Sequence, residues 1–186
     1  MKKILLTVLL FLITVNVFAV EVKIITLDIT REIPKWDKKT TIFLDVYFND
    51  QGKYILKFTN NTDDWNYDSW FAIEPFSLKF SNTHVTSFRN ILDKFIEWDD
   101  KAVENNVYDL EKMIEYSGDS VGNFAYIRKS NKSKLRMGLS HDYYSNDIYI
   151  LDSYQVKQLR NAISEESTKI YKDKVELRKQ QLDLFN

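Results

Sequence analysis

The chain has 186 residues, of which 44% are hydrophobic and 28% are charged, and its formal net charge is −1. This composition is typical of a folded globular domain and argues against intrinsic disorder. Because the chain has no cysteine, disulfides, thiol-linked lipid anchors and thiolate zinc sites are all excluded. With 4 Gly and 2 Pro, long linkers are not expected, so we predict one compact domain.

Residues 1–19 have the pattern of a secretory signal peptide. Lys2 and Lys3 begin it, an apolar run extends from Ile4 to Val15, and the segment ends on the small residue Ala19. The apolar run is shorter than a membrane-spanning helix requires, so we expect cleavage after Ala19 rather than an uncleaved anchor. Residues 20–186 then form the mature domain, and the loss of two lysines lowers the basic count from 26 to 24 against 27 acidic residues, a net charge of −3. We therefore predict an exported soluble protein, periplasmic or secreted, without a stable membrane span.

A strand, a capping residue and an amphipathic helix occur twice, 71 residues apart. The first copy has a strand at 76–80, Ser81 as the helix N-cap and a helix over about 83–105; the second has a strand at 148–151, Asp152 as the cap and a helix from Gln155 towards the C-terminus. The apolar helix positions match at this constant offset: Val85, Phe88 and Leu92 with Val156, Leu159 and Ile163. This correspondence predicts two pseudo-repeats, about 20–106 and 107–186.

Alternating apolar residues predict further strands before each helix. The segment 21–29 is a first strand, and strands at 41–48 and 53–58 flank a hairpin turn at 49–52 that ends on Gly52. A second hairpin joins 124–129 and 134–139 through 130–133. The predicted fold is therefore α+β, with one or two antiparallel sheets from two β-β-β-α pseudo-repeats, each backed by a long helix. We expect the helices to bury Phe88, Leu92, Phe95, Leu159 and Ile163.

The predicted C-terminal helix is longer than a small sheet needs. Its apolar positions Ile163, Ile170, Leu177 and Leu184 recur every seven residues, and about 30 helical residues span about 45 Å. Its end is expected to project, to fold back over the other repeat, or to pair with another chain as a homodimer.

Recognisable catalytic motifs are missing from the sequence. The two histidines, His84 and His141, lie far apart, and there is no nucleophile elbow, P-loop or dinucleotide fingerprint. We predict no catalytic residue, no cofactor and no metal site, although a hydrolase built on converging carboxylates stays an alternative.

The segment 60–70 combines acids, amides and large aromatic residues without periodicity. Its alternating oxygen side chains from Asp64 to Asp68 partly match a calcium loop, but Ser69 and Pro75 replace the required Gly and Glu. We expect Trp70 to begin a strand and pack in the core, and Trp65 and Tyr67 to be candidates for contact with a protein or glycan partner.

One dense basic cluster lies on the second hairpin. It predicts either a solvated hairpin, which we favour, or a surface for anions or single-stranded nucleic acid. Its members are Arg128, Lys129, Lys132, Lys134 and Arg136.

The order of elements resembles the repeat of whirly-type single-stranded-nucleic-acid binders and of the related transcriptional-coactivator domain. The residues 76–92 and 124–163 carry this resemblance, which implies the architecture of strands followed by a capped helix. We carry over no functional residue, because the predicted signal peptide and the acidic mature chain point away from nucleic acid. The leading prediction is an exported, non-enzymatic binding or interaction protein.

Overall fold

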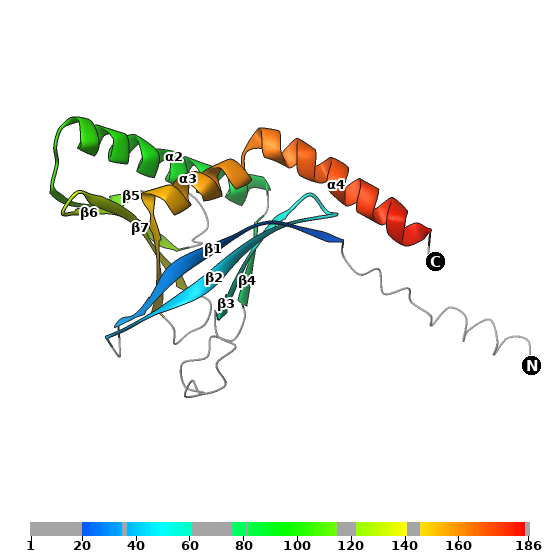
Figure 1. Ribbon diagram of the computed structural model, residues 1–186, viewed down its shortest axis with the longest axis horizontal. Helices are drawn as coiled ribbons and strands as arrows, with labels where there is room; N and C mark the ends of the chain where they lie inside the picture. The colour runs from blue at the N-terminus through cyan, green and yellow to red at the C-terminus, as the bar shows by residue number, and fades with distance from the viewer. Residues whose placement is uncertain are drawn as a thin grey trace, which may run out of the picture.

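The computed structural model describes residues 20–34, 37–60, 76–80, 82–114, 122–140 and 146–184. In these ranges, four strands and a helix are followed by four strands and two helices (Figure 1). The first group is β1 (Glu21–Ile33), β2 (Lys38–Asn49), β3 (Tyr54–Asn60), β4 (Phe76–Phe80) and α2 (Asn82–Glu104). The second group is β5 (Asp109–Ile114), β6 (Asn123–Lys129), β7 (Lys132–Ser140), β8 (Asn146–Asp152), α3 (Ser153–Ala162) and α4 (Glu165–Asp183).

The eight strands form one antiparallel sheet in the order β4-β3-β2-β1-β8-β7-β6-β5. Pairing of β1 with β8, for example Thr30 opposite Ile150, joins the two groups. The predicted α+β class with an antiparallel sheet is confirmed. The four strands named before the first helix are present, whereas the second repeat has four strands rather than the three expected there, because β5 was not predicted; the summary pattern β-β-β-α is therefore corrected to four strands in each repeat.

All three helices lie on the same side of the sheet, and α2 and α4 cover strands of the opposite repeat (Figure 1). From α2, Phe88 packs on Phe124 and Phe95 on Tyr126, with ring centroids 5.9 and 5.3 Å apart, so α2 covers β6. Helix α4 contacts β1 and β2, and its Tyr171 lies 6.2 Å from the Phe48 ring. Because each group of strands is covered by the other group's helix, the two repeats share one core.

The core contains the side chains that the helical periodicity selected. Phe88, Leu92, Phe95, Leu159 and Ile163 are all buried, as predicted. Each large apolar side chain removed from water contributes about 1.5–3 kcal/mol to folding. The shared core is therefore the main source of stability.

The predicted hairpin turn after β2 is confirmed. The Asn49 side-chain oxygen accepts hydrogen bonds from the N–H groups of Gln51 and Lys53, at 3.1 and 2.9 Å. Gly52 has a φ of +73°, a conformation that glycine adopts without steric cost. These interactions fix the β2–β3 register.

The predicted long C-terminal helix is interrupted. Asp152 caps α3 as predicted, and it exchanges hydrogen bonds of 2.8 Å with Gln155 in a capping box. After Ile163, Ser164 takes an extended conformation and accepts a hydrogen bond from the Ser167 N–H, which starts α4. The apolar stripe therefore does not continue as one buried face. Ile163 is buried, whereas Ile170, Leu177 and Leu184 are exposed.

Candidate interaction surface

The surface with the clearest binding character lies at the end of the sheet formed by β5. This strand lies beneath α2, away from the C-terminal end of the molecule (Figure 1). Between them is a groove of about 260 Å³, called here the β5 groove. Its lining includes Trp98 and Ala102 of α2, Val107 and Leu110 as an apolar floor, and Lys101 and Lys112.

Large apolar side chains are exposed near this groove and on the other face of β5. Tyr108 is 61% exposed and Met113 is 52% exposed, and Val103 and Leu110 are also exposed. Scattered single apolar residues are normal on protein surfaces, but a group at one end of the sheet is typical of an interaction site. The four residues lie within eleven positions of the chain, at the end of α2 and along β5.

The backbone of β5 adds a second property. The strand pairs with β6 on one side, and within the described ranges no strand pairs with its other side. An edge strand presents N–H and C=O groups that another chain can bind. Residues 109–113 are all exposed, so the strand is open to solvent.

The charge near the groove comes from lysines. Lys112 lies over the Trp98 ring at 4.4 Å from its centroid, and Lys94 lies at 5.6 Å. Glu97 pairs with both Lys94 and Lys101, at 3.0 and 2.7 Å, and these hydrogen bonds lower its pKa, that from Lys101 most. Lys112 has no carboxylate partner in the part of the chain that the structure describes. It is therefore available to an acidic group on a ligand.

The predicted basic cluster does not form one surface, because Arg128 is buried. Its side chain is 4% exposed and points into the core from β6. Arg128 donates to the Val107 carbonyl at 2.6 Å, to Ser133 Oγ at 2.9 Å and to Asp99 at 3.3 Å. This buried network ties the hairpin to α2, which makes Arg128 a structural residue and corrects its placement as a surface residue.

The other members of the cluster lie on the outside of the hairpin. Lys129, Lys132 and Lys134 are exposed, and Arg136 pairs with Glu111 of β5 at 2.7 Å. Three lysines thus remain for an anion. The paired carboxylate on the neighbouring strand reduces the local positive potential.

The aromatic, calcium-like and histidine candidates from the sequence add no residue to the candidate surface. Trp65, Tyr67, Trp70, His141 and the calcium-like segment 64–68 lie outside the described residues. His84 is half-buried in the first turn of α2. Across the ranges that the structure describes, no three His, Asp or Glu side chains gather where they could hold a metal ion. None of the helices found there is long and apolar enough to span a membrane.

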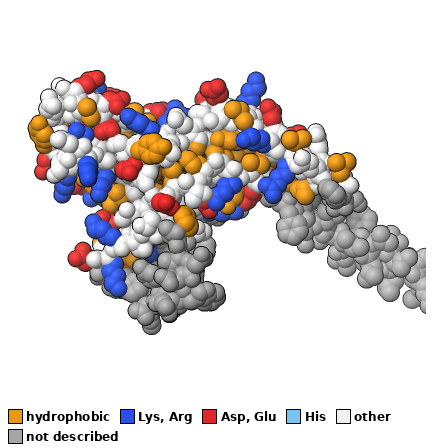
Figure 2. Space-filling model, in the orientation of Figure 1, with side chains coloured by type: hydrophobic (Ala, Val, Ile, Leu, Met, Phe, Trp, Pro, Cys, Tyr) orange, Lys and Arg blue, Asp and Glu red, His pale blue; other side chains and the backbone are white. Residues whose placement is uncertain are grey.

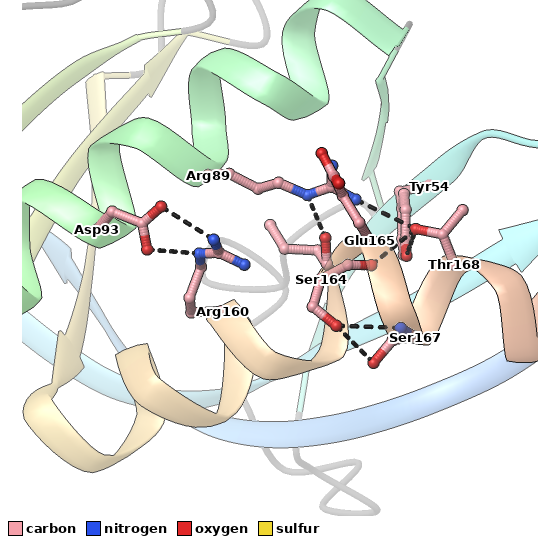
Figure 3. A network of polar contacts seen from close by, with 9 residues as sticks. Tyr54, Arg89, Asp93, Arg160, Ser164, Glu165, Ser167 and Thr168 are labelled. Carbon is pink, nitrogen blue, oxygen red and sulfur yellow. Dashed lines mark hydrogen bonds and ion pairs between the residues drawn. The ribbon is translucent and has the colours of Figure 1, made fainter.

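A polar network fixes the junction of α3 and α4 against α2 and β3 (Figure 3). Arg89 of α2 donates to the Ile163 carbonyl and, at 3.1 Å, to Thr168 Oγ1, which also contacts the Tyr54 hydroxyl at 2.7 Å. Burial raises the pKa of Tyr54, and its hydrogen bond with Thr168 acts in the opposite direction. Arg160 forms two hydrogen bonds with Asp93, at 2.6 and 2.9 Å. Arg89 and Arg160 are also 71 residues apart, the offset between the two repeats, and each contacts a helix of the other repeat.

Hydrophobic side chains also lie at the surface over α4 (Figure 2). The inner face of α4 packs on the core through Val175 and Tyr171. Ile170 and Leu177 are 50% and 56% exposed. The predicted homodimer through this helix stays a prediction.

The sequence-based predictions missed β5, and with it the main residues of the candidate surface. Its sequence Asp109–Ile114 alternates poorly and carries charges on both faces. The pseudo-repeat offered the missing evidence, because four strands before α2 imply four strands before α3.

Comparisons with known proteins identify no family for this chain. No protein-family profile and no curated protein matches it. Its structure is similar to that of an SsgA-like sporulation-specific cell division protein from Thermobifida fusca, with 8% identity over 90% of this chain and 97% of that one, and a TM-score of 0.47. It is also similar to SsgB of Streptomyces coelicolor, whose mutations correlate with longitudinal cell division during sporulation, with 8% identity, 84% and 94% coverage, and a TM-score of 0.40. At such identities and TM-scores these likenesses carry no conclusion about function.

Proposed function

We propose that the chain is an exported, non-enzymatic protein-interaction module that binds a protein partner at the β5 edge. The observation that carries the proposal is that the β5 groove, four exposed apolar side chains and a strand edge with no partner among the described strands occur at the same end of the sheet. Surfaces of this kind are rare on monomers unless they bind something. No chemistry beyond recognition is needed to account for them.

The distribution of acidic residues supports a binding role over a carboxylate hydrolase. Three acids of the described ranges are paired with cations at separate places: Asp45 with Lys23 at 2.6 Å, Asp93 with Arg160 and Asp99 with Arg128. A glycosidase-type pair needs two carboxyl groups facing one cleft. These ion pairs instead bridge strands and helices.

Export is proposed from the pattern of residues 1–19. The first strand follows immediately, and Val20 is buried with its carbonyl accepting a 3.0 Å hydrogen bond from the Asp50 N–H. Cleavage after Ala19 would leave Val20 and β1 intact. N-terminal sequencing of the protein isolated from the cells that make it tests this step, and a first residue other than Val20 would contradict it.

Nucleic-acid binding through the hairpin remains the second candidate, supported by the exposed lysines 129, 132 and 134. The burial of Arg128 and the pairing of Arg136 weaken it. Fluorescence titration with a single-stranded oligonucleotide at low and at physiological salt tests this function. Binding that weakens steeply with salt would favour it.

The interaction function is tested by site-specific photo-crosslinking in the cells that produce the protein. A photoreactive residue at Tyr108 or Met113 is expected to give a discrete covalent adduct with another protein. The matched control is Glu166, which is exposed on the first turn of α4 and distant in the fold. Adducts at neither Tyr108 nor Met113, or equal adducts at the control, would overturn the proposed function.

A further inference from the structure

We infer that the β5 edge binds an extended segment of its partner as an added strand, with an apolar and an acidic side chain two residues apart meeting the β5 groove. This inference rests on the proposed function and specifies the chemistry of its partner. Strand addition uses main-chain hydrogen bonds for affinity and alternate side chains for selectivity. The strand edge and the side chains of β5 determine the affinity and the selectivity of this binding.

The register of β5 places two of its side chains on the groove face. Leu110 lies opposite Arg128 and Lys112 opposite Tyr126 on β6, and Arg128 and Tyr126 both point into the core under α2. Leu110 and Lys112 therefore face the same side as α2 and line the groove. Because side chains of a strand alternate between faces, an added strand places every second side chain on this side as well.

The chemistry of these positions selects the side chains of the partner segment. Leu110, Val107, Ala102 and Trp98 offer apolar contact, and the groove of about 260 Å³ accommodates one large apolar side chain. Lys112, two residues from Leu110, has an ammonium group with no carboxylate partner among the described residues. An Asp or Glu directly opposite it forms a cross-strand ion pair. The expected pattern is therefore apolar-x-acidic, in either chain direction.

A second copy of β5 does not fit this edge well. When a two-fold axis perpendicular to the sheet pairs two copies of β5, each side chain stays on the same side of the sheet. Residues directly opposite each other therefore come from the same face of the strand. A register centred on the strand puts Glu111 opposite Glu111, or Lys112 opposite Lys112. Like charges directly opposite destabilise a strand pair. A heterologous acidic segment avoids this repulsion.

The experiment is a selection of random twelve-residue peptides displayed on phage, carried out in parallel against the purified protein and its Lys112→Glu variant. The protein is expected to enrich a large apolar residue and an Asp or Glu two positions apart. Lys112→Glu is expected to keep the apolar residue and to select Lys or Arg in place of the acid. Lys112 is exposed, so the variant preserves the fold.

The affinity of a synthetic peptide of the selected sequence for substituted variants then tests whether it contacts the groove face of β5. Leu110→Asp is expected to weaken its binding about tenfold or more, because it places a charge in the apolar floor. The matched control is Leu177→Asp, the same change at a 56% exposed position on α4 outside this surface, and a change below about threefold is expected there. Hydrogen exchange of the β5 amides is expected to slow when the peptide binds, because an added strand protects them.

Four results would overturn the inference: no enriched pattern, the same acidic residue selected by Lys112→Glu, equal peptide affinity for Leu110→Asp, or no slowing of exchange in β5. Failure of the proposed function is distinguishable from these. Adducts at Tyr108 or Met113 in cells without any selected peptide would leave the interaction module intact and remove strand addition. Absence of adducts at both positions would remove the function itself.

Discussion

Two cations on neighbouring strands, Arg128 of β6 and Lys112 of β5, face the same side of the sheet and differ completely in their surroundings. Arg128 is buried and donates hydrogen bonds to Val107, Ser133 and Asp99. Lys112 is exposed, its ammonium group lies over the face of Trp98, and no carboxylate among the described residues pairs with it. The guanidinium group completes an internal network, whereas the ammonium group is available to a ligand.

The difference shows that a dense cluster of basic residues in a sequence does not by itself indicate a basic surface, because some of its members can be buried. Burying a charge costs several kcal/mol unless partners satisfy it, so a buried arginine implies a complete set of acceptors. An exposed lysine on an edge strand requires no partner and costs little. The two residues are therefore expected to respond in opposite ways to substitution, one in stability and the other in binding.

The largest effect is expected for Arg128→Met, which leaves Asp99 buried without its partner. We expect the free energy of unfolding to fall by about 3–5 kcal/mol, measured by urea denaturation. The matched control is Lys129→Met, on the next and exposed position, with a change within about 0.5 kcal/mol.

The double variant Arg128→Met with Asp99→Leu sharpens this test. Replacing both members of a buried ion pair with apolar residues is often neutral or stabilising, so the double variant is expected to recover much of the lost stability. If the double variant is as unstable as Arg128→Met, the loss comes from the hydrogen bonds to Val107 and Ser133 rather than from the unpaired carboxylate. A small effect in Arg128→Met alone would contradict the role of the network.

The repeat-related arginines at the junction of α3 and α4 give the next effect. Arg89→Ala removes the donor to the Ile163 carbonyl and to Thr168, and we expect a loss of about 1–3 kcal/mol. Arg160→Ala breaks a more exposed pair with Asp93, for which about 0–1 kcal/mol is expected. Thermal unfolding of both variants measures the difference, and equal losses would show that burial does not separate the two arginines.

Much of the fold could be predicted from the sequence, because hydrophobic periodicity encodes it directly. The helices and their buried faces were identified from apolar positions that match between the repeats. These are Val85, Phe88 and Leu92 in the first repeat and Val156, Leu159 and Ile163 in the second. This match did not show that α2 covers β6 of the other repeat, since periodicity identifies a buried face but not its partner. The break at Ser164 was missed because the seven-residue apolar spacing runs through it, although Ser164 followed by two glutamates is a typical helix start.

The candidate surface was less predictable than the fold. An edge strand exposed on both faces has no apolar alternation, so Asp109–Ile114 lacks the pattern that identifies a strand. The charge of Arg128 suggested the surface, but its burial depends on Asp99, 29 positions earlier in the chain. Long-range pairing of this kind is invisible in a single sequence. The residues of the β5 groove come together only when α2 is placed over the sheet.

A smaller effect is expected at Tyr54, whose buried hydroxyl contacts Thr168. Tyr54→Phe is expected to cost about 1 kcal/mol at neutral pH. Burial raises the pKa of Tyr54, so as the pH rises the hydroxyl loses its proton in the unfolded chain before it does so in the folded protein. The stability that the protonated hydroxyl contributes is therefore present below about pH 10 and declines at higher pH. Urea midpoints at pH 8 and above pH 10 are expected to show the difference between the protein and Tyr54→Phe narrowing, and a difference that widens would contradict the direction of the shift.

The smallest effect on stability is expected for Lys112→Ala, and it completes the comparison with Arg128. The variant loses one exposed cation–π contact with Trp98, worth about 0.5–1 kcal/mol at most. It leaves no buried charge behind, because the ammonium group has no carboxylate partner in the described ranges. We therefore expect a urea midpoint close to that of the unmodified protein together with weaker binding of the selected acidic peptide. A loss of stability comparable to that of Arg128→Met would instead show that Lys112 is a structural residue. The proposed difference between a structural Arg128 and a ligand-binding Lys112 would then be wrong.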